Sequence, residues 1–292
     1  MSPTAEDRLV ALLLTNRLTD VEVAPLRATE YWPLLERVPN PGGLLGATET
    51  GLVERVGDAG LAGRVARLLD ASVAVAFACE RLDEAGVRVL TSFDAEFPAR
   101  LVGRLGRRCP PFLLAAGPAA VAGGIGVAGL REPSADAAAV ATMAGERIVS
   151  LGDRIVTGLS PGVDRLAMDA ALALGGAATV VPAEGLGLVG RRADTRSLVL
   201  GGRVTMLSPF GPETPRTTVT ARGRNRVVYG LADLTLVVAS DGDADTTFGG
   251  ASDALDHGDG PVVAWVGAGC GPTNPSLVER GARPLADLAV LR

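Results

Sequence analysis

The sequence contains no lysine, because every one of its 28 basic residues is an arginine. A Walker A phosphate loop and a Schiff base both require a lysine, so these two chemistries are excluded. His257 is the single histidine, which excludes catalysis by histidine pairs and metal sites built from several histidines. These absences remove several common classes of enzyme.

Cysteines, aromatic residues and long apolar runs are also scarce. Cys79, Cys109 and Cys270 are far apart and form no C-x-x-C pair, which argues against a disulfide framework and a zinc site. No apolar run approaches the roughly 20 residues that span a bilayer, and Glu6 and Asp7 precede the first apolar run, unlike in a signal peptide. We therefore expect a cytoplasmic protein without a membrane partner. Aromatics make up 3% of the chain, so base stacking would be minor in any nucleic-acid complex.

The charge is unevenly distributed. The net charge of −5 argues against a general polyanion binder, so a nucleic-acid surface would have to come from local clustering. One such cluster is present, and Asp194 and Glu213 are the only acidic residues within it. Its members are Arg191, Arg192, Arg196, Arg203, Arg216, Arg222, Arg224 and Arg226.

Hydrophobic periodicity divides the chain into three parts. Residues 1–86 carry helical spacing, residues 87–116 form a linker with extended pieces at 87–91 and 112–116, and residues 117–292 alternate strands with helices. The predicted strands are 123–130, 154–158, 178–183, 204–209, 234–240 and 261–267, and the predicted helices are 135–151, 163–174, 224–232 and 248–257. The strands lack polar alternation, which is typical of parallel strands buried on both faces. The sequence thus predicts a doubly wound, mostly parallel α/β sheet preceded by a small helical domain, with ligands at the carboxyl ends of the strands.

The stretch "TGLSPGVDRLAMDAALALGG" follows the second of these strands. Gly158 ends the strand and the helix begins near Val163, so free N–H groups and the helix dipole favour an anion there. Gly158 and Gly162 would let the backbone approach a phosphate, Ser160 would donate a hydrogen bond, and Asp164 would fix the first turn or bind a ribose. An ordinary strand-to-helix turn is the alternative, since the first strand ends in "GLREPS" and lacks a G-x-G-x-x-G fingerprint.

Four blocks in this order resemble the DNA-processing protein A family, also called DprA or Smf. They are "LTSFDAEFPARL" with "CPPFLLAAG", "VAGLREPS", "GLSPGVDRLAMDAALALGG" and "RGRNRVVYGLADLTLVVAS". The likeness covers most of the chain, including the helices before residue 87, which resemble the family's small SAM or helix-hairpin-like module. The resemblance implies an extended Rossmann-like domain that binds and protects single-stranded DNA and helps load the strand-exchange recombinase RecA in natural transformation and recombination. It further implies a homodimer with no catalytic residue, metal or cofactor.

The predicted DNA- and phosphate-binding residues combine this resemblance with the chemistry of the arginines. They are Gly129, Arg131, Pro133, Ser134, Gly158, Leu159, Ser160, Gly162, Val163, Asp164, Arg222, Arg224, Asn225, Arg226, Gly249 and Gly250. Arg131, Arg224 and Arg226 would grip phosphates with their guanidinium forks. Surface salt bridges are the alternative, and they are the better interpretation for Arg191, Arg192, Arg196 and Arg203.

The chain also departs from the family pattern. Pro161 replaces a basic residue of the turn, Met168 replaces a histidine, and "DADTTFGGAS" replaces a Ser-Gly-Ser block. A nucleotide-binding sensor or a phosphoribohydrolase-like enzyme of the same superfamily therefore remains an alternative. Such hydrolases carry a Pro-Gly-Gly-x-Gly-Thr turn and a catalytic Glu that this chain lacks, which leaves Asp253 as the candidate acid or base.

Overall fold

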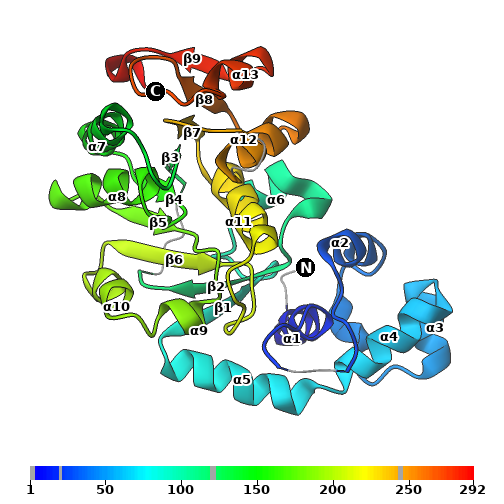
Figure 1. The fold of residues 1–292 in the computed structure, drawn as a ribbon. Coiled ribbons are helices and arrows are strands. Elements are labelled where there is room, and N and C mark those ends of the chain that lie inside the picture. The colour runs from blue at the N-terminus through cyan, green and yellow to red at the C-terminus, as the bar shows by residue number, and fades with distance from the viewer. Residues whose placement is uncertain (1–3, 20–21, 119–122, 243–245) are drawn as a thin grey trace.

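One mixed sheet organises the molecule, as shown by a computed structural model that describes residues 4–19, 22–118, 123–242 and 246–292. Within these ranges the sheet has nine strands in the order β1-β2-β6-β5-β4-β3-β7-β8-β9 (Figure 1). The strands are β1 (Val87–Thr91), β2 (Phe112–Ala116), β3 (Ile125–Ala128), β4 (Ile155–Thr157), β5 (Ala178–Val180), β6 (Val204–Ser208), β7 (Leu234–Val237), β8 (Val262–Trp265) and β9 (Arg283–Leu285). Neighbouring strands from β6 through β9 pair in parallel. The predicted mostly parallel α/β fold is confirmed.

The segment 87–116 contributes two strands to this sheet. β1 pairs antiparallel with β2, and β2 pairs antiparallel with β6, so both strands extend the parallel part of the sheet at one edge. The extended pieces have the predicted bounds, but they are hydrogen-bonded to the α/β region, and α6 (Ala99–Leu105) between them packs on the sheet. Pairing between residues about 90 positions apart leaves no local signal in the sequence.

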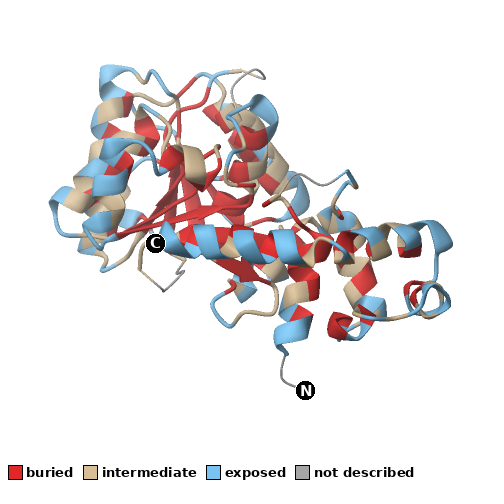
Figure 2. Cartoon of the chain, turned by 90° about the horizontal axis from the view of Figure 1, so that it is seen from below, coloured by how far each residue is buried: buried red, intermediate tan, exposed pale blue. Residues whose placement is uncertain are grey.

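Helices cover both faces of the sheet. α7 (Ala135–Ser150) and α8 (Val163–Ala173) pack on one face, whereas α6 and α11 (Thr218–Leu231) pack on the other (Figure 1). Adjacent residues of β4 show the alternation, since Ile155 belongs to the core beneath α7 and α8 and Val156 to the core beneath α6 and α11. The strands are accordingly buried between outer helices that expose one side to solvent (Figure 2).

Shorter elements complete the α/β part. Between β5 and β6 lie α9 (Leu186–Val189) and α10 (Ala193–Leu200), and α12 (Thr246–His257) and α13 (Asn274–Glu279) pack around β8. α11 begins six residues before its predicted start, because Thr217 caps it by accepting a hydrogen bond of 3.1 Å from the Thr220 N–H. Threonine at positions 218 and 220 has low helix propensity, which hid this start from the periodicity.

The N-terminal helices form a separate cluster with its own core. Its core is shared by α1 (Ala5–Leu14), α2 (Ala28–Arg37), the 3-10 turn η1 (Pro41–Leu44), α3 (Glu49–Val56) and α4 (Ala59–Leu69). α5 (Ser72–Glu84) follows them, and two more 3-10 turns, η2 (Gly106–Arg108) and η3 (Leu288–Val290), lie elsewhere in the described chain. Leu14, Leu34 and Leu68 meet in the helical core, whereas Val75 and Leu82 of α5 join the core of the sheet. In the described part of the chain, no helix has the length and apolarity to cross a membrane.

Candidate nucleic-acid interface

A pocket of about 430 Å³ lies where β3, β4 and β5 end. These strands are parallel neighbours, so the loops that follow them meet at one edge of the sheet. Of the predicted residues, Arg131, Gly158, Leu159 and Ser160 line this pocket, which we call the interface pocket. The cavity therefore lies at the carboxyl ends of the strands, where strand polarity predicts a ligand.

Two of the four arginines in the interface pocket are neutralised by acidic neighbours. Arg192 Nη2 lies 2.9 Å from Glu184 Oε1. Arg165 Nε lies 2.8 Å from Asp169 Oδ2, and its Nη1 lies 3.6 Å from Asp194 Oδ2. These pairs hold the wall formed by α8 and α10, and they leave little net charge on it.

The other two arginines, Arg131 and Arg216, have free guanidinium groups. Both residues are exposed, and neither side chain makes an ion pair or hydrogen bond with any residue that the structure describes. Arg131 follows β3, and Arg216 lies just before the cap of α11, so they approach the pocket from different loops. The pocket thus presents two unpaired cations, which is the arrangement that binds phosphate oxygens.

Beneath the pocket, Arg224 of α11 and Asp164 of α8 form a buried ion pair, which we call the hub. Arg224 is 3% exposed and Asp164 is 5% exposed. Arg224 Nη1 lies 3.6 Å from Asp164 Oδ2, and Arg224 also donates to Ser160 Oγ at 3.0 Å and to the carbonyl of Val181 at 3.4 Å. Arg224 therefore ties α11 to the loop after β4 and to the residue after β5.

The Asp164 carboxylate accepts hydrogen bonds from backbone N–H groups of the loops after β3 and β4. The N–H of Ser160 donates to Asp164 Oδ2 at 3.3 Å, and the N–H groups of Gly129 and Gly158 also interact with this carboxylate. Burial raises the pKa of Asp164 above its ordinary value, and the positive charge of Arg224 opposes that shift. Burial likewise lowers the pKa of Arg224. Of the two roles considered for Asp164, the contacts are those of a residue that fixes the turn.

Contacts within the protein require glycine at two positions of the turn, and the sequence did not reveal these contacts. A Cβ at Gly158 would overlap the guanidinium of Arg224. Gly162, with φ +79°, would bring a Cβ against the carbonyls of Leu130 and Arg131. The sequence analysis expected these glycines to let a phosphate approach the backbone. At both positions the group that lies against the backbone belongs to the protein itself.

Several other predicted residues serve packing or capping. A Cβ at Gly129 would overlap Val163, which is fully buried at the start of α8. Ser134 caps α7 by accepting a hydrogen bond of 3.2 Å from the Ala137 N–H, and Pro133 precedes this cap. None of these four predicted residues lines the interface pocket.

The predicted residues of α11 and α12 differ in their exposure and in their contacts. Arg222 is exposed, whereas Arg226 Nη2 lies 3.4 Å from Asp253 Oδ2 on α12. Asn225 donates to the carbonyl of Thr246 at 2.7 Å and fills the space that a Cβ at Gly250 would need. Gly249 faces open space. The "R-N-R" segment therefore contributes to the hub and to the contact with α12, and no residue of it lines the interface pocket.

The sequence analysis did not assign Arg165, Glu184, Asp194 or Arg216 to the site. Glu184 follows β5, so the rule that ligands lie at the carboxyl ends of strands would have included it. Arg216 belongs to the basic cluster, but its loop position gave no reason to prefer it to its neighbours. The outer arginines Arg191 and Arg192 form salt bridges, as expected. The same expectation is wrong for Arg203, which donates to the carbonyl of Leu172 at 2.8 Å, and for Arg196, which forms no salt bridge with a described residue.

In the described ranges, no group of three or more His, Cys, Asp or Glu is arranged to hold a metal ion. The candidate acid or base Asp253 is contacted by Arg226, by Arg108 at 3.6 Å and by His257 at 3.1 Å. Its carboxylate therefore belongs to an ion-pair network between α12, α11 and η2.

Comparisons with known proteins agree with this fold. The family model described as DNA recombination-mediator protein A matches residues 88–283. The crystal structure of DNA processing protein A from Streptococcus pneumoniae superposes with a TM-score of 0.74 at 20% identity, covering 99% of this chain and 97% of that chain. A structure of DNA processing protein A from Helicobacter pylori, described by its single-stranded DNA binding mode, gives a TM-score of 0.56 at 16% identity and covers 70% of this chain and 93% of that chain. Comparison with curated protein sequences gives no significant match.

Proposed function

Because the chain belongs to the DNA recombination-mediator protein A family, we propose that it binds single-stranded DNA at the interface pocket. In this proposal Arg131 and Arg216 hold backbone phosphates, and the hub fixes the loops that carry the pocket. The Helicobacter pylori relative is described as binding single-stranded DNA, which supports the choice of ligand.

The observation that carries the proposal is the pair of unpaired, exposed guanidinium groups beside one cavity at the carboxyl edge of the sheet. Phosphate contacts supply affinity without reading sequence, so the protein would bind strands of different sequence alike. The few aromatic residues are consistent with binding dominated by charge.

The biological role follows the family. We propose that the protein acts in the cytoplasm as a homodimer, protects single-stranded DNA and assists RecA loading in transformation and recombination. It would act as a binding protein without catalysis. The engagement of Asp253 by two arginines supports this, since a general acid or base needs access to its substrate.

Fluorescence anisotropy with a short labelled oligothymidylate tests the ligand. Each neutralised phosphate contributes about −0.7 to the slope of log affinity against log salt concentration, so two arginines give a slope of about −1.4. Unlabelled nucleoside monophosphates are added as competitors. Binding of the monophosphate alone would favour the nucleotide sensor, and binding of neither ligand would contradict the proposal.

Matched variants locate the contact. Arg216→Ala should weaken binding of the oligonucleotide and flatten the salt slope by about 0.7. Arg67→Ala removes an equal charge from the exposed surface of α4, where Arg67 forms no ion pair with a described residue, and should leave affinity and slope unchanged. Equal effects of the two variants would show that the pocket is not the binding site.

A further inference from the structure

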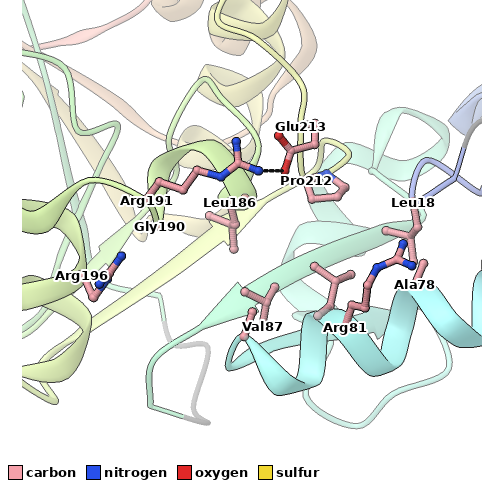
Figure 3. Close-up of a pocket in the computed structure, with 13 residues that line it drawn as sticks. Leu18, Ala78, Arg81, Val87, Leu186, Gly190, Arg191, Arg196, Pro212 and Glu213 are labelled. Carbon is pink, nitrogen blue, oxygen red and sulfur yellow. Dashed lines mark hydrogen bonds and ion pairs between the residues drawn. The ribbon is translucent and has the colours of Figure 1, made fainter.

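A groove of about 540 Å³ lies between α5, the start of β1 and the loop that follows β6 (Figure 3). Its floor is apolar and includes Leu18, Leu82, Val87 and Leu186. Three arginines, Arg81, Arg191 and Arg196, line the groove together with a single carboxylate, that of Glu213. The groove therefore combines an apolar floor with a cationic rim, and it is distinct from the interface pocket.

Most of the positive charge on this rim is not neutralised. Arg191 Nη2 lies 2.8 Å from Glu213 Oε1, the contact drawn in Figure 3. Arg81 and Arg196 are exposed, and their side chains make no ion pair or hydrogen bond with the residues that the structure describes. Two guanidinium groups therefore remain available to an anionic ligand.

A second cavity of about 490 Å³ continues the groove, because Arg81, Pro212 and Glu213 line both. It adds Arg17, which is partly buried and has no side-chain partner within the described ranges. Burial lowers the pKa of Arg17. A partly buried cation without a partner carries a desolvation cost, and a bound anion would offset that cost.

The groove and the interface pocket are lined by the same two chain segments. In residues 184–196, Arg192 lines the interface pocket and its neighbour Arg191 lines the groove. In residues 211–216, Arg216 lines the pocket and Glu213 lines the groove. Consecutive Cα atoms are about 3.8 Å apart, so the two cavities lie close together beside the same segments, and a flexible strand can reach from one to the other.

We propose that a single strand of DNA bound at the interface pocket continues into this groove, so that Arg196, Arg81 and then Arg17 contact successive parts of its backbone. The proposal rests on the proposed function, and it adds a second subsite to that function. The apolar floor contacts the faces of bases, and the guanidinium planes both stack on bases and hold phosphates. The closeness of the groove to the interface pocket, together with the unpaired arginines along it, favours a long polyanion over an acidic peptide, which would need the groove alone.

The length of the bound oligonucleotide separates the two subsites in the intact chain. Labelled oligothymidylates of roughly 4 to 30 nucleotides are titrated at several salt concentrations. The wild-type protein should gain affinity with length until the strand fills the groove, and the salt slope should become steeper over the same range. The double variant Arg81→Glu with Arg196→Glu should bind the shortest strands normally and lose this gain, with about tenfold weaker binding and a slope flatter by about 1.4 for the longest.

A control variant makes the same change of charge elsewhere. Arg67→Glu with Arg292→Glu alters two exposed arginines outside both cavities. It should retain the length dependence of the wild-type protein. Thermal melting of both double variants should stay close to that of the wild-type protein, because the replaced side chains form no ion pair with a described residue and the single hydrogen bond lost is the one of 3.4 Å from Arg67 to the carbonyl of Gly63.

The outcomes distinguish the second subsite from the proposed function. If the wild-type protein binds no strand of any length, both proposals fail. If short strands bind but added length brings no gain, or the groove variant behaves as the control does, the second subsite alone is overturned. If oligoglutamate binds the wild-type protein, fails to bind the groove variant and leaves the DNA length series unchanged, the groove is a peptide site and the proposal is also overturned.

Discussion

Arg224 and Arg131 are arginines at the same edge of the sheet, yet their surroundings are opposite. Arg224 is 3% exposed and is held by Asp164, Ser160 and the carbonyl of Val181. Arg131 is exposed and has no side-chain partner in the described structure. A buried, paired guanidinium stabilises the loops, whereas an exposed, unpaired one is free to bind a ligand. The number of arginines in a segment therefore says less about binding than the burial of each one.

The largest effect is expected on removal of Arg224. Arg224→Ala leaves the Asp164 carboxylate buried without its cation, so the free energy of unfolding should fall by about 3–5 kcal/mol. Arg222→Ala, two residues earlier and exposed, should change it by less than about 0.5 kcal/mol. Urea denaturation measures both variants, and similar losses in the free energy of unfolding would contradict the distinction between the buried hub and an exposed arginine of the same helix.

The second largest loss of stability is expected when a methyl group is added at Gly158. It would overlap the Arg224 guanidinium, and overpacking of this kind costs about 1–3 kcal/mol. The cost should largely vanish when Gly158→Ala is combined with Arg224→Ala, since the overlapping group is then absent. Gly249→Ala, which faces open space within α12, should instead stabilise the protein by roughly 0.5–1 kcal/mol. Additive losses in the double variant would mean that the two residues do not touch.

Removal of a partly exposed ion pair among the N-terminal helices should have an intermediate effect on the free energy of unfolding. Arg64 donates to both oxygens of Glu30, at 2.8 and 2.9 Å, and this hydrogen bonding lowers the pKa of Glu30 from 4.5 to about 2. Because the folded-state pKa is lowered, the stabilisation is present above pH 4.5 and is lost as the pH falls towards 2. Glu30→Gln should cost about 1–2 kcal/mol at neutral pH, after allowance for solvent screening.

Denaturation of the Glu30→Gln variant across this pH range checks the sign. The difference from the wild-type protein should shrink as the solution becomes more acidic. Glu36→Gln is the control, because the pair of Glu36 with Arg107 is more than half exposed and should contribute less than about 0.5 kcal/mol. If the stability difference between Glu30→Gln and the wild-type protein grows as the pH falls, the pair with Arg64 does not stabilise the fold in the predicted way.

The smallest change in stability is expected at Arg131 of the interface pocket, where the effect should be on binding. Arg131→Ala should leave the free energy of unfolding within about 0.5 kcal/mol of the wild-type value. It should flatten the salt slope for single-stranded DNA by about 0.7 and weaken different sequences alike. Arg192→Ala is the comparison, since Arg192 is already paired with Glu184 and should contribute less. A drop in stability without a change in slope would assign Arg131 to the structure of the loop.

The sequence predicted where the candidate site lies but did not assign roles to the residues within it. The turn after β4 was identified from its glycines and strand polarity, and four predicted residues line the interface pocket. The roles of Asp164 and Arg224 were not evident, because residues 64 positions apart, such as Ser160 and Arg224, are brought together only when α11 packs on the sheet. Arg216 was missed for the same reason.

What the sequence determined by itself is local: the alternation of buried strands and helices, the two extended pieces of segment 87–116, and the glycine turn at a strand end. These follow from hydrophobic period and backbone preference, which act over a few residues. The tertiary structure alone decided which arginines are buried, which acids pair with them and which guanidinium groups stay free. Burial depends on the elements that pack over a side chain, and in this protein those elements come from distant parts of the chain.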